Sequence, residues 1–279
     1  MRDECVMDLT EMAEEGLLDT LIGRQDEIER VMQILCKTRK NNPCLIGVPG
    51  VGKTVIVRGL ANQIATSIVP PELVEKRVLA LDLRQMIVGT SNTDEFERTL
   101  IEAVDGCGKA RNIVLFISEL HTLVAAGAGS KAGDGANILK EAIERGGLQC
   151  IVETTPQEYR EYIEKDRSFK RCFQNVHIIS EPSIEEAIEI LKAMCPKHEA
   201  HHKVTYETDA LVAAVRLSKK YTRDRFLPDS AIDLIDEAGA RFQLQKLKLP
   251  LSEPVITVKD IKHVISMGTG IAVEVLNMN

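Results

Sequence analysis

A glycine-rich run near residue 50 has the residue types and spacing of a phosphate-binding loop. The run follows the pattern G-x-x-x-x-G-K-[ST] and consists of Gly47, Val48, Pro49, Gly50, Val51, Gly52, Lys53 and Thr54. In such a loop, backbone N–H groups of the glycine turn and of the following helix N-terminus surround phosphate oxygens. We expect Lys53 to reach the β- and γ-phosphates of ATP and Thr54 to ligate Mg²⁺. The alternative is a chance Gly/Pro turn, against which the strand and helix predicted on either side argue.

A second candidate lies at the end of the apolar run Ile113–Ile117, which is followed by Ser118 and Glu119. In ATPases with a phosphate-binding loop, this strand places one acidic residue beside Mg²⁺ and a glutamate beside the attacking water. Glu119 fits the second role, whereas Ser118 has no charge to supply on the metal side. The alternative is a solvated glutamate at a strand end, and the loop upstream favours the catalytic interpretation.

A second candidate metal site is a group of cysteine and histidine residues, namely Cys195, His198, His201 and His202. Structural zinc sites usually show paired ligand spacings, which this group lacks, and Pro196 disrupts the helical register. We therefore expect a solvated helix terminus there, with zinc ligation as the weaker alternative. The seven cysteines of the chain are odd in number and never spaced C-x-x-C. This usage is typical of reduced, mostly buried thiols in an intracellular protein.

The spacing of apolar residues predicts alternating strands and helices from residue 25 onward. The expected strands are Pro43–Gly47, Arg77–Leu83, Asn112–Ser118, Leu148–Thr154 and His177–Ile179. The expected helices are Gln25–Cys36, the helix that follows the loop through Ile64, Asp94–Val104, Ala136–Arg145, Ser183–Met194, Thr208–Tyr221, Asp229–Leu244 and Val258–Ser266. Strands joined by helices indicate an α/β fold with a parallel sheet that is covered on both faces.

The change from strands to helices places a domain boundary at residue 182. We expect residues 1–182 to form the large α/β nucleotide-binding domain and residues 183–279 to form a small helical domain with a short C-terminal extension. Ser183, with Glu186 three residues later, predicts a capping box at the start of the small domain. The Pro-bearing segment Lys246–Pro254 is its one loose stretch.

Composition narrows the classes of partner. The 279-residue chain has 35 Lys plus Arg against 42 Asp plus Glu, and this net charge of −7 argues against sequence-independent binding to nucleic acid or to an anionic membrane. Aromatic residues make up only 4% and Trp is absent, so we expect no aromatic-lined groove for bases or sugars. The apolar run Ile113–Ile117 is too short to span a bilayer, and residues 1–20 lack the hydrophobic stretch of a secretory signal.

Seven runs spread along the chain carry a resemblance to a known family. They are Leu21–Arg24, Asn41–Gly47, Leu148–Ile151, Tyr159–Arg160, Tyr162–Asp166, Asp224–Asp229 and Ala231–Ala238. From about Leu9 to Val273 the chain resembles the first ATPase domain of the Clp unfoldases, and is most similar to the plastid and bacterial ClpC type. The resemblance implies a P-loop NTPase fold of the AAA+ type with a helical lid, and ATP and Mg²⁺ as ligands.

The same resemblance implies partners and a location. Other Clp ATPase subunits would join this chain in a homo- or hetero-oligomer, expected to be a hexameric ring. Protein substrates or a Clp protease would be further partners. The expected location is intracellular and soluble, in the chloroplast stroma or, as the alternative, in the bacterial cytoplasm.

The resemblance also implies roles for single residues. Glu119 would orient the attacking water, Thr155 would sense the γ-phosphate, and Arg171 would reach the phosphate of a neighbouring subunit. Ile22, with the region that ends at Pro228, would line the adenine pocket. The alternatives are a locally satisfied threonine for Thr155, a surface arginine for Arg171, and ordinary core contacts for the adenine-pocket residues.

Departures from the family pattern bear on activity. The family aspartate before Glu119 is Ser118, and the second of two adjacent arginines is Cys172. The aromatic pore loop is replaced by Ser91–Asp94, so that Asn92 stands where a tyrosine grips the substrate. The coiled-coil middle insertion is absent from this stretch of the chain.

Three hypotheses remain on these grounds. Loss of a residue that supports the ligands of a metal costs about 10–100-fold in metal affinity or activity, and an arginine finger is worth about 10³–10⁵ in rate. The departures therefore favour ATP binding with residual or weak hydrolysis, acting in protein unfolding or quality control. The alternative is a hydrolysis-deficient interaction subunit that joins or regulates rings of related Clp ATPases. A small-molecule kinase is disfavoured, because the helical part lacks the clustered arginines of a substrate lid.

Overall fold

The computed structural model describes residues 5–18, 21–125, 134–176, 180–222, 225–246 and 255–278. Two compact units make up the chain. The first contains Met1–Gly47 and Lys53–Ile179, and the second contains Val48–Gly52 and Ser180–Asn279. Each unit has a buried apolar core of its own.

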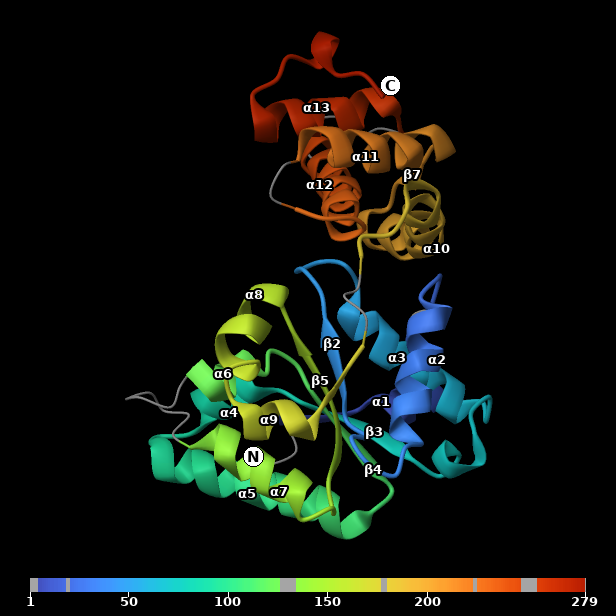
Figure 1. The fold of residues 1–279 in the computed structure, drawn as a ribbon. Helices are drawn as coiled ribbons and strands as arrows, with labels where there is room; N and C mark the ends of the chain where they lie inside the picture. The colour runs from blue at the N-terminus through green and yellow to red at the C-terminus, as the bar shows by residue number, and fades with distance from the viewer. Residues whose placement is uncertain are drawn as a thin grey trace. The chain divides into compact units, whose positions relative to one another are not determined.

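A six-stranded sheet forms the centre of the first unit, in the order β1-β3-β4-β5-β2-β6 (Figure 1). Its strands, in chain order, are β1 (Val6–Asp8), β2 (Pro43–Ile46), β3 (Arg77–Leu81), β4 (Ile113–Ile117), β5 (Gln149–Thr154) and β6 (Gln174–Asn175). Neighbours pair in parallel, apart from the antiparallel pair of β1 and β3. The predicted α/β fold is confirmed. The antiparallel edge strand was not expected, because three residues are too few to show a periodic pattern.

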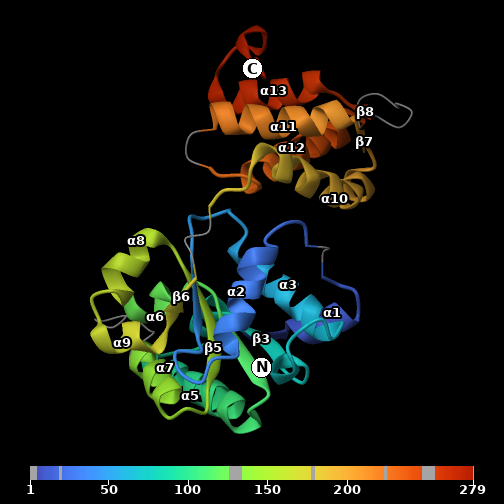
Figure 2. The same cartoon turned by 45° about the vertical axis from the view of Figure 1, so that its right-hand side comes forward.

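Helices cover both faces of this sheet (Figures 1 and 2). One face is covered by α1 (Leu9–Glu14), α2 (Gln25–Leu35) and α3 (Lys53–Ala65), and the other by α5 (Thr93–Ala110) and α7 (Gly135–Glu144). Shorter helical elements are η2 (Pro71–Leu73), α4 (Leu83–Gly89), α6 (His121–Ala125), α8 (Pro156–Glu158), η3 (Tyr159–Ile163) and α9 (Arg167–Cys172). Covered faces explain why β2 and β4 are continuous apolar runs rather than alternating ones, and why the centre of β5 from Cys150 to Val152 is apolar as well.

Two details differ from the expected elements of this unit. Helix α5 continues past the predicted end at Val104 to Ala110, and its Gly108 lies near the backbone of Gly147. The described edge strand is β6, since the predicted strand at residues 177–179 lies outside the described residues. Next to β6, the buried Asn42 side chain donates to the carbonyl oxygen of Cys172 and accepts from the backbone N–H of Cys150.

The second unit is helical, as predicted. It contains α10 (Ile184–His202), α11 (Thr208–Tyr221), α12 (Asp229–Lys246), α13 (Val258–Thr269), the short parallel pair β7 (Thr205–Tyr206) and β8 (Val255–Ile256), and η4 (Val273–Val275). The capping box at Ser183 is present: its hydroxyl accepts from the N–H of Glu186 at 3.1 Å, and the Glu186 carboxylate accepts from the N–H of Ser183 at 2.8 Å. Residues 247–254, most of the predicted loose segment, lie outside the described residues.

Helix α10 corrects one expectation. It continues through Pro196, which removes one backbone donor without ending the helix, and reaches His202. His202 is only 3% exposed, so the prediction of a solvated helix terminus is wrong for this residue. Its Nε2 lies 2.8 Å from Oδ1 of Asp236, and His198 Nδ1 lies 3.2 Å from the same oxygen. These contacts connect α10 to α12.

Two general properties complete the fold. The seven cysteines, all within the described residues, form no disulfide; five are buried, Cys5 is half-buried and Cys36 is exposed. Among the described helices, none combines the length and apolar character that crossing a membrane requires.

Candidate active site

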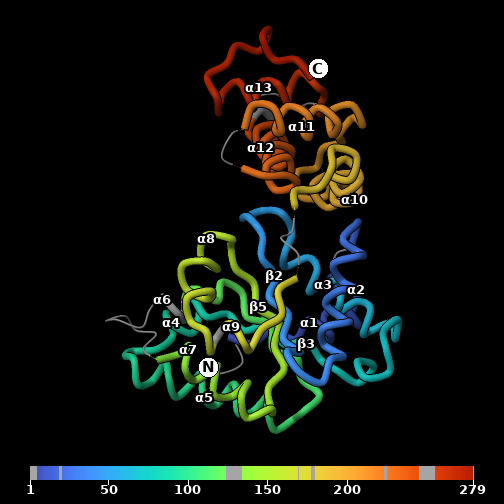
Figure 3. Tube along the Cα trace, in the orientation of Figure 1, coloured from blue at the N-terminus to red at the C-terminus, as the bar shows by residue number. Residues whose placement is uncertain are grey.

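The glycine-rich run connects the end of β2 to the first residue of α3 (Figure 3). Gly50 and Gly52 have φ angles of +79° and +90°, in the left-handed region that side chains rarely adopt. Lys53 turns back over the loop, where its Nζ donates to the carbonyl oxygen of Gly47 at 3.0 Å. The strand, loop and helix N-terminus of a phosphate-binding loop are therefore all present.

The electrostatic surroundings of Lys53 suit an anion-binding role. Burial lowers the pKa of its ammonium group, while the carboxylates of Glu153, Glu158 and Glu119 oppose that shift. A partly desolvated ammonium beside a helix N-terminus binds phosphate oxygens more strongly than a solvated one.

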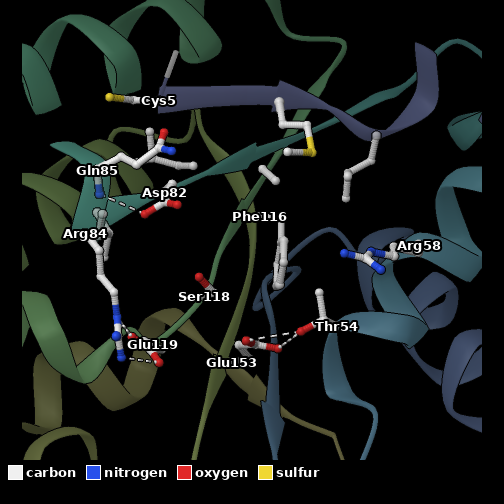
Figure 4. Close-up of a pocket in the computed structure, with 15 residues that line it drawn as sticks. Cys5, Thr54, Arg58, Asp82, Arg84, Gln85, Phe116, Ser118, Glu119 and Glu153 are labelled. Carbon is white, nitrogen blue, oxygen red and sulfur yellow. Dashed lines mark hydrogen bonds and ion pairs between the residues drawn. The ribbon is translucent and has the colours of Figure 1, made fainter. Parts of the chain in front are cut away.

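The ends of β4 and β5 bring together residues that are far apart in the chain. The two strands are parallel, and Ile117 pairs with Val152. The next residue on each strand is therefore Ser118 beside Glu153, with Glu119 one position further (Figure 4). We call Ser118, Glu119 and Glu153 the strand-end cluster.

A cavity of about 380 Å³ opens at the strand-end cluster (Figure 4). Its lining includes Thr54, Arg58, Arg84, Ser118, Glu119 and Glu153. The hydroxyl and carboxylate oxygens in this lining are the donors that Mg²⁺ prefers in proteins. The residues present therefore fit this metal, with Thr54 in the place expected from the sequence.

Glu153 was not among the residues expected at the site. Its side chain is 7% exposed, and the Thr54 hydroxyl donates to its two oxygens at 3.1 and 3.4 Å. Burial raises the pKa of this carboxyl, whereas Lys53 and the hydrogen bond from Thr54 oppose the shift. The available signal was a charged residue that directly follows the apolar run from Cys150 to Val152, still within the strand predicted from Leu148 to Thr154.

Glu119 adopts an unusual backbone conformation, with a φ of +52° that is uncommon for residues other than glycine. Its backbone carbonyl accepts from the N–H of Thr122 at 2.8 Å, which closes the turn after β4. Both carboxylate oxygens are bound by Arg84 of α4: Nε lies 2.6 Å from Oε2 and Nη2 lies 2.7 Å from Oε1. The expected water-orienting carboxylate is thus engaged by an arginine in this structure (Figure 4).

Thr155 directly follows β5 and caps α8. Its hydroxyl oxygen accepts from the N–H of Glu158 at 3.2 Å, and the Glu158 carboxylate accepts from the N–H of Thr155 at 3.0 Å. Thr155 therefore has a local hydrogen-bond partner, as the alternative interpretation of this residue predicted. The hydroxyl proton is not used by this cap and can be donated to a ligand.

The two residues at the expected arginine pair have opposite environments. Arg171 is exposed in the last turn of α9. Cys172 is buried, its thiol donates to the carbonyl oxygen of Ser168, and burial raises its pKa to about 11. Position 172 in this fold therefore belongs to the core rather than to the surface.

The remaining expected residues lie in different elements. Ile22 is half-buried in the segment before α2, and Pro228 is half-buried directly before α12. In the expected pore loop, the side chain of Asn92 caps α5 by accepting from the N–H of Glu95 at 2.9 Å. Asn92 is thus a helix cap in this structure.

Comparisons with known proteins agree with this architecture. The family described as "ATPase family associated with various cellular activities (AAA)" matches residues 43–179, and the family described as "AAA lid domain" matches residues 183–266. The chain is 52% identical over 248 residues to the chloroplastic chaperone protein ClpC2 of Arabidopsis thaliana, which covers 89% of this chain and 26% of that protein. It is 50% identical over 248 residues to the negative regulator of genetic competence ClpC/MecB of Bacillus subtilis, covering 89% and 30% of the two chains.

Solved structures of Hsp104 have the same fold. The S. cerevisiae Hsp104–ADP complex matches with a TM-score of 0.87 and 38% identity, over 97% of this chain and 46% of that one. A closed-state Hsp104 structure with ATPγS and FITC-casein matches with a TM-score of 0.88 and 38% identity, over 98% and 47%. The chain thus spans less than a third of the length of these two curated relatives and about half the length of these solved chains.

Proposed function

The chain belongs to the AAA ATPase family, with an AAA domain followed by an AAA lid, and we propose that it is the ATP-binding module of a ClpC-like chaperone ATPase with weak hydrolytic activity. The observation that carries the proposal is the phosphate-binding loop itself, set between a buried strand and a helix N-terminus with Lys53 folded over it. ATP and Mg²⁺ are the proposed ligands. Millimolar Mg-ATP should raise the melting temperature of the protein, and a protein that Mg-ATP leaves unchanged would refute the proposal.

Roles follow for the residues around the loop. Lys53 would hold the β- and γ-phosphates, Thr54 would ligate Mg²⁺, and Glu119 would orient the attacking water. Thr155 would donate its free hydroxyl proton to the γ-phosphate. Measuring ATP affinity and phosphate release on one sample separates binding from turnover.

Three residues lead us to propose that ATP turnover is slow. Ser118 carries no charge where the family pattern has an aspartate, and Cys172 is a buried thiol where it has an arginine. In addition, Arg84 occupies both oxygens of the Glu119 carboxylate. Glu119 must leave Arg84 before it can orient a water molecule, which reduces the fraction of competent enzyme.

Assembly is proposed from Arg171, which is exposed and could reach a phosphate on a neighbouring subunit. The expected partners are other Clp ATPase subunits, in a homo- or hetero-oligomeric ring that is expected to be hexameric. If Arg171 acts between subunits, turnover per chain should rise steeply with protein concentration, and Arg171→Ala should remove that rise while leaving ATP affinity unchanged. A turnover per chain that is constant from the monomer upward would exclude this role.

A second candidate function is a hydrolysis-deficient subunit that binds ATP and joins or regulates rings of related chains. The observation that favours it is Asn92, which caps α5 and offers no apolar surface to grip an extended polypeptide. In an unfolding assay with a tagged substrate, this chain alone should show no ATP-dependent activity, whereas efficient unfolding would favour an autonomous unfoldase. Protein substrates or a Clp protease would then be reached through the partner subunits.

The adenine pocket and the location of the protein are two further proposals. Ile22 and Pro228 are the proposed adenine contacts, and bulky substitutions at either should weaken ATP and ADP binding to a similar degree. We propose the chloroplast stroma or, as the alternative, the bacterial cytoplasm as its location, because its curated relatives include chloroplastic and bacterial proteins.

A further inference from the structure

We propose that Glu153 on β5 supplies the metal-side carboxylate of the nucleotide site, in place of the charge that Ser118 does not carry on β4. The proposal rests on the proposed nucleotide site and names one of its metal contacts. Four observations support it: the strand register, the hydrogen bond to Thr54, the burial of the carboxylate, and the engagement of the other carboxylate in the cluster.

The register puts the two positions side by side. Because Ile117 pairs with Val152 in a parallel ladder, Ser118 and Glu153 follow on adjacent strands and share one face of the sheet. Both line the same cavity, together with Thr54 (Figure 4). A glutamate on β5 can therefore reach the region that a shorter carboxylate on β4 would reach.

The contact with Thr54 is the one that a metal-ligating hydroxyl needs. A threonine hydroxyl has one proton to donate and two oxygen lone pairs. In this structure Thr54 gives its proton to the Glu153 carboxylate, at 3.1 Å from Oε2. Both lone pairs of Thr54 Oγ1 are then left for a cation, and the carboxylate lies next to that cation.

Burial makes a purely structural role for Glu153 costly. A carboxylate that is 7% exposed loses most of its hydration, and a single neutral hydroxyl compensates this loss poorly. Across the described ranges, Thr54 is the one side chain that donates a hydrogen bond to it. Lys53 and Arg58 are nearby positive charges that favour the carboxylate, and a divalent cation at this place would compensate its lost hydration more fully.

The other carboxylate of the cluster is already engaged. Both oxygens of Glu119 are held by Arg84, and the Glu119 side chain is 39% exposed. Glu119 therefore remains the residue proposed to orient the attacking water, and Glu153 is the carboxylate that lies beside Thr54.

The test compares nucleotide affinity with and without metal, which does not depend on turnover. The dissociation constant for ADP is measured by calorimetry on the full chain, once in excess EDTA and once in excess Mg²⁺, and their ratio is the metal enhancement. Mn²⁺ bound in the presence of ADP is measured independently by electron paramagnetic resonance. The variants are Glu153→Gln, Glu153→Asp, the double variant Ser118→Asp with Glu153→Gln, and Glu144→Gln on the exposed face of α7 as the matched control.

Glu153→Gln should lower the metal enhancement by about tenfold or more, because the amide still accepts from Thr54 but has no charge. The double variant should restore most of the enhancement, since it returns a carboxylate to β4. Glu153→Asp should lose less than Glu153→Gln, and Glu144→Gln should match the wild type. Mn²⁺ binding should follow the same order.

Three results would overturn the proposal. They are an unchanged enhancement in Glu153→Gln, a double variant that recovers nothing although its affinity in EDTA is normal, and a Glu153→Asp protein no better than Glu153→Gln. If Glu153→Gln fails to fold, as shown by lost ADP binding in EDTA, the metal enhancement of Glu153→Asp is compared with that of the wild type. This comparison then decides whether Glu153 contributes to the metal site. A wild-type chain that binds no nucleotide in EDTA or in Mg²⁺ refutes the proposed function as well. A wild type that binds nucleotide, alongside an unchanged Glu153→Gln, refutes only the role of Glu153.

Discussion

The phosphate-binding loop and the strand-end cluster serve one proposed site but are assembled in different ways. The loop is a continuous run whose shape depends on Gly50 and Gly52, so all its parts are present or absent together. The cluster takes Ser118 and Glu119 from β4 and Glu153 from β5, and it exists because two parallel strands end at the same edge. The loop can therefore be predicted as a unit, whereas in our proposal the metal-side charge of the cluster is on β5 instead of β4 within the same strand pairing.

The largest expected effect is the loss of ATP turnover in Glu119→Gln, a variant that tests the strand-end cluster. Glutamine cannot take up the proton of an attacking water, so turnover should fall by about 10²–10⁴-fold, or to the background, while ATP affinity changes little. Phosphate release and calorimetric affinity on the same sample check this. Glu144→Gln is the control, and normal turnover in Glu119→Gln would remove this residue from the catalytic machinery.

The next largest effect is the loss of ATP affinity in Lys53→Ala, a variant that tests the phosphate-binding loop. Charge-assisted hydrogen bonds to phosphate contribute enough that ATP affinity should fall by about 10- to 100-fold, and stabilisation by Mg-ATP should disappear from the melting curve. Lys192→Ala is the matched control, because Lys192 is an exposed lysine of α10 with an ion pair to Glu189. Equal affinities for Lys53→Ala and Lys192→Ala would mean that the loop does not hold the phosphates.

A smaller effect, of opposite sign, is expected from Arg84→Ala. Removing Arg84 frees the Glu119 carboxylate, so turnover should rise several-fold; the rise is limited because Arg84 is 74% exposed and exposed ion pairs are weak. Arg145→Ala, which removes the exposed pair with Glu141, is the control. Slower turnover in Arg84→Ala would instead show that Arg84 assists catalysis, for example by contacting the nucleotide.

The smallest effect sharpens the contrast within the cluster. Ser118→Ala removes a neutral hydroxyl, so the metal enhancement of ADP binding should change by less than about twofold. Glu153→Gln, measured beside it, should have a far larger effect. If Ser118→Ala lowers the enhancement and Glu153→Gln does not, the metal-side interaction belongs to Ser118 rather than to Glu153.

Sequence patterns predicted the loop and most elements because each depends on neighbouring residues. The glycines that the turn requires and the apolar runs of β2 and β4 are visible without a partner strand. Glu153 was missed because its position beside Ser118 and Thr54 follows from strand pairing, which a single strand does not reveal. Arg84 was missed for the same reason, as its partner Glu119 belongs to another element.

Element ends were harder to predict. Helix α5 was expected to stop at Val104, yet it continues to Ala110 and buries the side chain of Cys107. Helix α10 was expected to stop near Pro196, yet burial of His202 and its contact with Asp236 favour two further turns. In both cases tertiary packing outweighs the local preference of the residue.

The uneven exposure of the seven cysteines offers a practical route to spectroscopy. Cys36, directly after α2, is the single exposed thiol, so a maleimide dye should attach there without any engineered substitution. Partial burial and the nearby Glu72 carboxylate raise the pKa of the Cys36 thiol, so the coupling should proceed faster at mildly alkaline pH, where more thiolate is present. The native chain could thus carry one fluorophore for anisotropy or single-molecule measurements.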